Sequence, residues 1–269
     1  MSAPRKQHEK LLSRGLQFSF LLALLLVWYL ATARWGVSRI LLPAPATVWR
    51  ELDDVLRSGE FLPHLRVTLI ELASAFAIAC TFGLGSGYLI SRTRYAMAVF
   101  EPLLASIYSV PMILLLPLYV LFFGLGSGSK IALGATVSFF PIVLSTIAGF
   151  GSVERIFVTS ARSMGASNAQ MFRYVLLPAA LPVVVTGLRM GFTIALLAIL
   201  GSETIASFAG LGHKIAQLAE AMETARMFAY IAFAVAIVAI LNIITTALER
   251  RVKLQRRKTV NATPSCGEC

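Results

Sequence analysis

The chain has 269 residues, of which 57% are hydrophobic and 14% charged, and its mean hydropathy is +0.77. Soluble domains carry about 25% charged residues, so this composition excludes a soluble globular protein and indicates an integral membrane protein in a lipid bilayer. The formal net charge is +11, but the basic residues cluster at the ends of apolar segments and not on an aromatic surface, which argues against nucleic acid as a partner.

Six segments are apolar enough to cross a membrane. A helix needs about 20 predominantly apolar residues to span the hydrocarbon core. The sequence therefore predicts an all-α integral membrane protein with about six transmembrane helices, in a single domain over residues 1–269. The predicted spans are 16–33, 67–90, 103–123, 131–150, 182–202 and 227–247.

The first of these spans has two interpretations. Its basic start, its short apolar core and the Ala-Thr-Ala at 31–33 fit a cleavable signal peptide. Its apolar run is long for a signal core, and Trp28 and Tyr29 near its end are typical of the aromatic belt at a membrane surface, which favours an uncleaved anchor.

The distribution of Lys and Arg predicts that both termini are cytoplasmic. Of the 24 basic residues, 15 lie in the segments that this orientation places inside and 8 in those that it places outside. The strongest contribution is the C-terminal "ERRVKLQRRK". The predicted cytoplasmic parts include an N-terminal tail at 1–15, a loop at 151–181 and a basic tail at 248–269.

The stretch "TSARSMGASNAQMFRYVLLP" at 159–178 interrupts the apolar spans with a polar, helix-prone sequence. Its pattern predicts a helix that ends near Met164, a stop at Gly165 and a second helix from Ser167 or Asn168, because glycine readily ends a helix and serine caps the next one. Two short helices at an angle would form a projection suited to a groove on another protein.

This stretch resembles the EAA loop of ABC importer permeases, in which Glu-Ala-Ala, a glycine, an isoleucine and a closing Leu-Pro follow one another at fixed spacing. The glycine position is Gly165, the isoleucine position is Val175, and Pro178 closes the motif. The chain departs from the pattern at the start, where Thr-Ser-Ala at 159–161 replaces Glu-Ala-Ala. This departure removes an acidic side chain but keeps the helix–glycine–helix pattern.

Other segments are similar to the nitrate, sulfonate and taurine group of these permeases, among them "LLPAPATVW", "FFPIVLSTIAGF" and "GSETIASFAGLGHKI". The resemblance implies the type I ABC importer permease fold and a bacterial inner-membrane subunit that is not itself an enzyme. It implies ABC ATPase subunits, a solute-binding protein and a second permease chain, as a homodimer, as partners. It also implies that ATP and magnesium bind to the ATPase subunits, so we expect no cofactor in this chain.

The resemblance further implies that residues 159–178 dock on the ATPase subunits as coupling helices. The residues expected at this contact are Thr159, Ser160, Ala161, Arg162, Gly165, Ala166, Ser167, Met171, Arg173 and Pro178.

Neither a catalytic nor a metal-binding pattern is recognisable in the sequence. The three histidines, His8, His64 and His213, are isolated, and a lone CxxC at Cys266 and Cys269 has no second pair. We therefore expect no catalytic residue and no metal site.

A phosphate-binding loop is likewise not expected. The glycine-rich segment at 124–131, "GLGSGSKI", lacks the Gly-Lys-Ser/Thr order of such a loop and is predicted to be an outer turn. Three acidic residues are predicted to lie on a solvated outer loop: Glu203, Glu220 and Glu223.

Polar residues inside the spans are the candidates for a transport path, because they are costly in lipid and usually face the bundle interior. The candidates are Glu71, Ser74, Ser106, Tyr108, Ser109, Ser138, Ser145, Arg189 and Thr193. Arg189 can either extend to the cytoplasmic interface or line an anion path. Prolines at 111, 117 and 141 are expected to kink their helices around such a path.

The resemblance implies transport of nitrate, a sulfonate, taurine or a related small solute, and relatives that carry thiamine-precursor pyrimidines are an alternative. A different class of function, a self-sufficient ion-coupled carrier or channel, predicts inverted repeats and ionisable groups within the membrane. The sequence shows neither feature clearly, whereas it does contain the docking loop.

Overall fold

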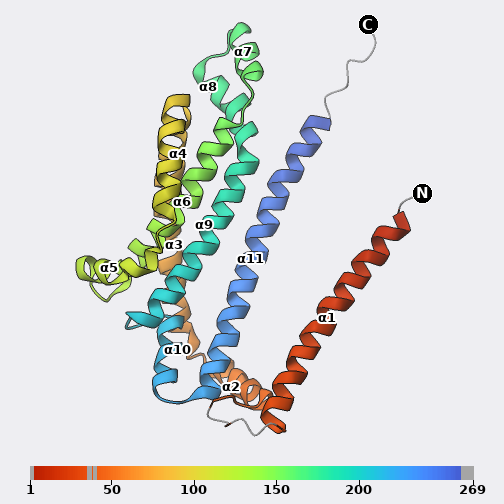
Figure 1. Cartoon of the computed structure of the whole chain (residues 1–269), viewed down its shortest axis with the longest axis vertical. Helices are drawn as coiled ribbons and strands as arrows, with labels where there is room; N and C mark the ends of the chain where they lie inside the picture. Colours follow the sequence, from red (N-terminus) through yellow and green to blue (C-terminus); the bar gives the residue numbers. More distant parts are fainter. Residues whose placement is uncertain (1–2, 35–37, 39–40, 262–269) are drawn as a thin grey trace. The chain divides into compact units, whose positions relative to one another are not determined.

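The computed structural model describes residues 3–34, 38 and 41–261, and these residues form helices joined by short turns (Figure 1). They form two compact units, one from the residues up to Phe61 together with Lys214–Phe233, and the other from Leu62–His213 together with the residues from Ala234 onward. The longer helices are α1 (Ala3–Ala33), α2 (Pro45–Ser58), α3 (Phe61–Ser91), α4 (Arg94–Tyr108), α5 (Leu116–Phe123), α6 (Ser127–Gly151), α7 (Arg155–Ser163), α9 (Leu177–Ile205), α10 (Leu211–Glu220) and α11 (Thr224–Asn261).

The first unit contains α1 and the amphipathic helix α2. Helix α2 starts with Pro45 in its first turn and ends at Gly59, whose φ of 72° is left-handed. Within this unit, Trp28 Nε1 donates a 3.1 Å hydrogen bond to the carbonyl of Pro43. The predicted span 16–33 lies inside α1, and its apolar described part, Leu22–Ala33, is shorter than a spanning helix.

Among the residues that the structure describes, four helices are long and apolar enough to cross a membrane. They are Phe61–Ser91, Ser127–Gly151, Asn168–Ile205 and Thr224–Arg251, and they contain the spans predicted at 67–90, 131–150, 182–202 and 227–247. The predicted basic tail starts within α11, which continues to Asn261, and the predicted N-terminal tail is helical from Ala3. Cys266 and Cys269 lie outside the described residues.

The span predicted at 103–123 is not one straight helix. Helix α4 and the segment Met112–Phe123, made of the 3-10 turn η1 (Met112–Leu115) and α5, are bent by 73° relative to each other. The break contains Pro111, which has no backbone N–H to continue the helix. Pro117 lies in the first turn of α5, where a missing N–H costs little, and α6 continues as a helix through Pro141.

The core of the second unit lies between α3, α6 and α9, and glycines let these helices approach closely. A Cβ added at Gly83 of α3 would lie 2.8 Å from Ile142 Cγ2 of α6, and one at Gly191 of α9 would lie 2.7 Å from Ile142 Cγ1. Small residues have this role in membrane helix packing. One buried apolar cluster of this core comprises Leu72, Ala75, Ala135, Ala195, Leu196 and Ile199.

Candidate functional site

The predicted break between two helices at Gly165 is present. Helix α7 ends at Ser163, and Gly165 has a φ of +79°, in the left-handed region that favours glycine. Two backbone hydrogen bonds close the end of the helix, from Gly165 N to the Arg162 carbonyl at 2.9 Å and from Ala166 N to the Ala161 carbonyl at 3.1 Å. The chain therefore reverses here by a local mechanism that needs no distant contact.

Ser167 caps the second helix, as its position before Asn168 predicts. Its backbone N donates to Gln170 Oε1 at 2.8 Å, and Gln170 N donates to Ser167 Oγ at 3.3 Å, which is a reciprocal capping box. The helix α8 (Asn168–Met171) passes through one π-helical turn, η2 (Phe172–Leu176), directly into α9. We name the whole segment from Arg155 to Pro178 the coupling loop.

The expected docking residues divide between the surface and the inside of the coupling loop. Ala161 and Met171 are buried, at 6% and 5% exposure, and hold the loop together. Ala166 is half-buried. The exposed members of the set are Thr159, Ser160, Arg162, Gly165, Ser167, Arg173 and Pro178.

Large apolar side chains are also exposed on the coupling loop, although the set of expected docking residues does not include them. They are Ile156, Phe157, Met164 and Tyr174, all more than half exposed. Exposed apolar side chains at this density are typical of an interaction surface.

Most hydroxyl groups among the candidate path residues bond within their own helices. Ser138 Oγ donates to the Gly134 carbonyl at 2.6 Å, Ser106 Oγ to the Pro102 carbonyl at 2.8 Å, and Ser109 Oγ to the Ser106 carbonyl at 2.7 Å. Such bonds satisfy a hydroxyl in an apolar environment. Ser138 is fully buried, whereas Ser106 and Ser109 are exposed.

The other candidates lie at separate places in the second unit. Ser74 is half-buried on α3, and Ser145 of α6 contacts Gly187 of α9. The ring of Tyr108 stacks on that of Phe140 with centroids 5.6 Å apart. The structure therefore spreads these residues over several helices of the unit.

Thr193 and Arg189 connect α9 with α11. Thr193 Oγ1 lies 2.9 Å from Asn242 Oδ1, and Arg189 Nη1 donates to Glu249 Oε2 at 2.8 Å. Thr186 Oγ1 donates to the other carboxylate oxygen of Glu249 at 3.0 Å. Arg189 therefore forms an ion pair between helices, an arrangement that neither of its two sequence interpretations includes.

Three charged side chains are buried together in the second unit: Glu71 of α3, Lys130 of α6 and Glu203 of α9. Each is at most 1% exposed. The Lys130 Nζ donates to the carbonyls of Leu125 and Gly126, whereas neither carboxylate oxygen of Glu71 has a hydrogen-bond partner among the described residues. We name these three residues the buried charge cluster.

The position of Glu203 corrects the prediction of a solvated outer loop. Its Oε1 accepts a 2.7 Å hydrogen bond from Thr68 Oγ1, and its Oε2 accepts a 2.8 Å bond from Gly212 N. The chain between α9 and α10 turns back over the carboxylate, and Gly210, with a φ of +112°, packs directly against it. A buried carboxylate requires such partners, because burial of an unpaired charge is very costly.

Comparison with known proteins identifies the family. The family model described as "Binding-protein-dependent transport system inner membrane component" matches residues 78–254, more than half of the chain. The chain belongs to this family. The match includes the whole coupling loop and most of the buried charge cluster.

Individual relatives agree with this assignment. The permease is 32% identical over 248 residues to the taurine transport system permease protein TauC of Escherichia coli, covering 90% of each chain. It is 29% identical to the putative aliphatic sulfonates transport permease protein SsuC of Bacillus subtilis, covering 84% of this chain and 82% of that one. It is also 31% identical to the riboflavin transport system permease protein RibX of Chloroflexus aurantiacus, with 86% of each chain covered.

Solved structures show the same fold. The MetNI methionine ABC transporter in an inward-facing conformation matches with a TM-score of 0.60 at 19% identity, over 71% of the permease and 95% of that chain. An amino acid ABC transporter crystallised with histidines matches with a TM-score of 0.59 at 22% identity, over 77% and 97%. The fold is that of a type I ABC importer permease, and the protein is a transporter subunit and not an enzyme.

Sequence reasoning missed the burial of three charged side chains in this permease. Lys130 and Glu203 lie at the ends of predicted spans, and Glu249 lies at the start of the predicted basic tail. A charge at the end of an apolar segment is usually solvated, so its position gives no signal of burial. Glu71 was the exception, because a carboxyl group inside a span already indicates a buried site.

Proposed function

We propose that this permease docks its ATPase partners through the coupling loop. The observation that carries this proposal is the pair of capped helices separated by Gly165, with apolar side chains such as Phe157 and Met164 exposed on them. Closure of the ATPases on ATP would move the coupling loops and rock the spans between inward-facing and outward-facing states. In this proposal ATP and magnesium bind only to the ATPase subunits.

We also propose a membrane orientation and an assembly. The excess of Lys and Arg in the predicted inner segments supports cytoplasmic termini in a bacterial inner membrane. A single chain has one coupling loop, and an importer with two ATPase subunits needs two, so a second copy of the permease completes the assembly. A binding protein would deliver the solute from the outer side.

For the substrate, we propose taurine or another small sulfonate. The support is the similarity to TauC over 90% of both chains, together with the match to SsuC. Riboflavin is a second candidate, because RibX is nearly as similar. The exposed and half-buried members of the candidate path, such as Ser74, Ser106 and Ser109, would contact the solute. Their hydroxyl groups can form hydrogen bonds with either a sulfonate or riboflavin.

The docking proposal is tested by purifying the tagged permease from its native membrane and identifying bound ATPase subunits by mass spectrometry, for wild type and for a Gly165→Trp variant. A side chain at Gly165 would have space but would strain a backbone with φ +79°. Gly85→Trp is the matched control, since Gly85 on α3 also has nothing within 4 Å of an added Cβ.

We expect the ATPase to copurify with wild type and with Gly85→Trp but not with Gly165→Trp. An undiminished ATPase yield from Gly165→Trp would contradict docking through this loop. A permease that purifies alone in every form would instead favour the self-sufficient carrier.

The substrate proposal needs the whole transporter in proteoliposomes with its own binding protein. Uptake of labelled taurine that depends on ATP, with no uptake of labelled riboflavin, is the expected result. Uptake of labelled riboflavin without uptake of labelled taurine would instead identify riboflavin as the substrate.

A further inference from the structure

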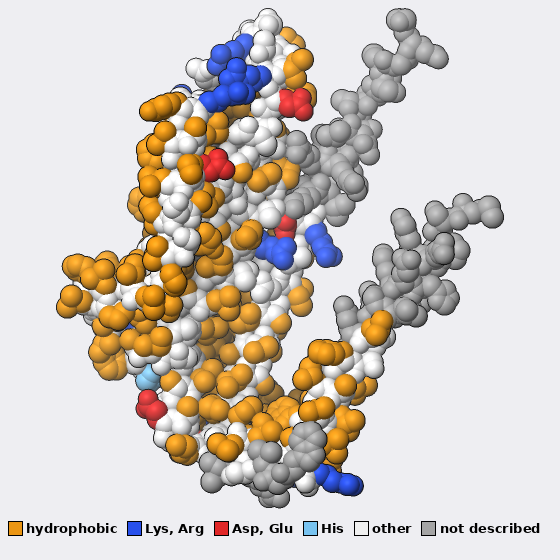
Figure 2. Space-filling model, in the orientation of Figure 1, with side chains coloured by type: hydrophobic (Ala, Val, Ile, Leu, Met, Phe, Trp, Pro, Cys, Tyr) orange, Lys and Arg blue, Asp and Glu red, His pale blue; other side chains and the backbone are white. Residues whose placement is uncertain are grey.

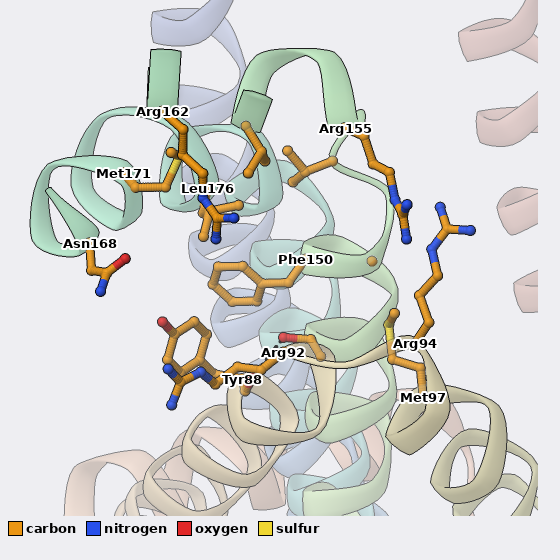
Figure 3. Close-up of a pocket in the computed structure, with 14 residues that line it drawn as sticks. Tyr88, Arg92, Arg94, Met97, Phe150, Arg155, Arg162, Asn168, Met171 and Leu176 are labelled. Atoms are coloured by element: carbon orange, nitrogen blue, oxygen red, sulfur yellow. Dashed lines mark hydrogen bonds between the residues drawn. The ribbon is translucent and has the colours of Figure 1, made fainter. Parts of the chain in front are cut away.

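A cavity of about 310 Å³ lies between the coupling loop and the ends of α3, α4 and α6 (Figure 3). The lower part of its lining comes from the turn between α3 and α4, and the upper part from α7, α8 and η2. Four of its 14 lining residues are arginines: Arg92, Arg94, Arg155 and Arg162.

The positive charge of this cavity is not balanced by its own lining. The lining contains neither Asp nor Glu, and in the part of the chain that the structure describes none of the four arginines forms an ion pair. In Figure 3 the guanidinium groups of Arg94 and Arg155 point toward each other, and that of Arg162 points into the cavity above Phe150. Converging like charges repel each other unless an anion lies between them.

Most of the remaining lining is aromatic or apolar, and its uncharged polar members are Ser91 and Asn168. The rings of Tyr88 and Phe150 have centroids 5.1 Å apart, and Met97 lies beside Gly151. Both α3, which ends at Ser91, and α6, which ends at Gly151, are helices long enough to cross the membrane. In a bilayer the ends of these helices would lie in the headgroup region, where aromatic and basic side chains are enriched.

From this geometry we propose that the cavity binds the phosphate group of an anionic phospholipid headgroup. Guanidinium groups bind phosphate by paired, charge-assisted hydrogen bonds, and the apolar lining would accommodate the adjoining glycerol and acyl carbons. The phosphate would lie between Arg94 and Arg155, whose guanidinium groups point toward each other in Figure 3, and would thus tie the coupling loop to the start of α4. Arg92 and Arg162 add positive charge elsewhere in the lining. This site is additional to the proposed ATPase contact.

The position of the cavity favours a lipid over a carboxylate of the ATPase. The cavity lies on the side of α7 and α8 that faces the spans, whereas the exposed apolar side chains Phe157, Met164 and Tyr174 offer a separate surface for a protein partner. Figure 2 shows basic side chains gathered at the end of the molecule where α7 and α8 lie, next to the hydrophobic flank of α4. A lipid can reach such a site from the bilayer.

The test measures lipid binding to the purified full-length permease by native mass spectrometry and by thermal unfolding in detergent. The probes are phosphatidylglycerol, phosphatidylcholine and inorganic phosphate. The variant R94Q/R155Q removes the two facing guanidiniums, R94K/R155K keeps the charge, and Arg250→Gln is the control for loss of an exposed arginine elsewhere in the same unit.

We expect phosphatidylglycerol to bind and stabilise wild type and the Arg250→Gln control, with affinity reduced about tenfold or more in R94Q/R155Q and by less in R94K/R155K. Phosphatidylcholine and inorganic phosphate should have little effect. An unchanged unfolding midpoint of lipid-free R94Q/R155Q shows that the variant is folded.

Three results would overturn the proposal. Equal binding of phosphatidylglycerol to wild type and R94Q/R155Q would show that Arg94 and Arg155 do not bind the lipid. Equal protection by inorganic phosphate would assign the site to a soluble anion. Normal lipid binding by R94Q/R155Q together with loss of ATPase copurification would assign the arginines to the protein partner.

Discussion

Arg189 of α9 and Glu249 of α11 form a 2.8 Å ion pair between helices that are far apart in the sequence. The Glu249 side chain is 7% exposed, and it also accepts a hydrogen bond from Thr186, so both of its oxygens are used. The pair therefore fixes the register of α11 against α9 near the predicted cytoplasmic ends of both helices.

Breaking this pair should weaken the contact between α9 and α11. We expect Glu249→Met and Arg189→Met each to lower the stability of the permease by about 1–2 kcal/mol, because interhelical polar contacts in membranes have modest strength and the arginine is partly exposed. The double variant should lose less stability than the sum of the losses of the two single variants. Thermal unfolding in detergent measures all three, and strict additivity would show that the residues do not interact.

Removal of the cation from the buried charge cluster should be more damaging. Lys130→Met removes the cation of the cluster and the hydrogen bonds from its Nζ to the carbonyls of Leu125 and Gly126, and we expect a loss of about 3 kcal/mol in the free energy of unfolding. The K130M/E71M double variant should recover part of it, because it removes one of the two carboxyl groups. Lys214→Met, at a partly exposed lysine, is the control and should change the unfolding midpoint little.

Gly210 should tolerate no side chain. A Cβ at this position would overlap the carboxyl group of Glu203, and the φ of +112° is unfavourable for every residue except glycine. Gly210→Ala should therefore lower stability by about 2 kcal/mol or more, whereas Gly201→Ala on α9, which has open space, should be neutral. A stable, transport-competent Gly210→Ala permease would contradict the close packing of Gly210 against the Glu203 carboxylate.

The cap at Ser167 should control the order of α8. Ser167→Ala removes the hydroxyl that accepts from Gln170 N, and a lost N-cap costs about 1 kcal/mol. We expect faster hydrogen exchange of the amides in Asn168–Met171 and weaker ATPase docking. Ser167→Asp should restore both, and Ser163→Ala, at an exposed position just before the turn, should match wild type.

Local features of the permease follow directly from its sequence. The coupling loop breaks at Gly165 and restarts after Ser167 as predicted, because a left-handed glycine and a serine cap act within a few residues. Four of the predicted spans coincide with long helices, since an unbroken apolar run in lipid must satisfy its backbone internally.

The bend in the third predicted span is a feature that hydropathy does not predict. Both halves, α4 and α5, are apolar, so the 73° change of direction near Pro111 leaves no mark in the hydropathy. Proline indicates that a helix is interrupted, but the angle between the two halves depends on what each half packs against. Here α4 and α5 both contact α6.

The sequence by itself thus determined the membrane class, the family and the local form of the coupling loop, all of which depend on composition or on short-range pattern. Only the tertiary structure decided which charges are buried and with which partners. Thr68 and Glu203 are 135 residues apart and yet form a 2.7 Å hydrogen bond. An apolar periodicity indicates that a helix face is buried, but the partner of a polar group depends on how the helices pack together in space.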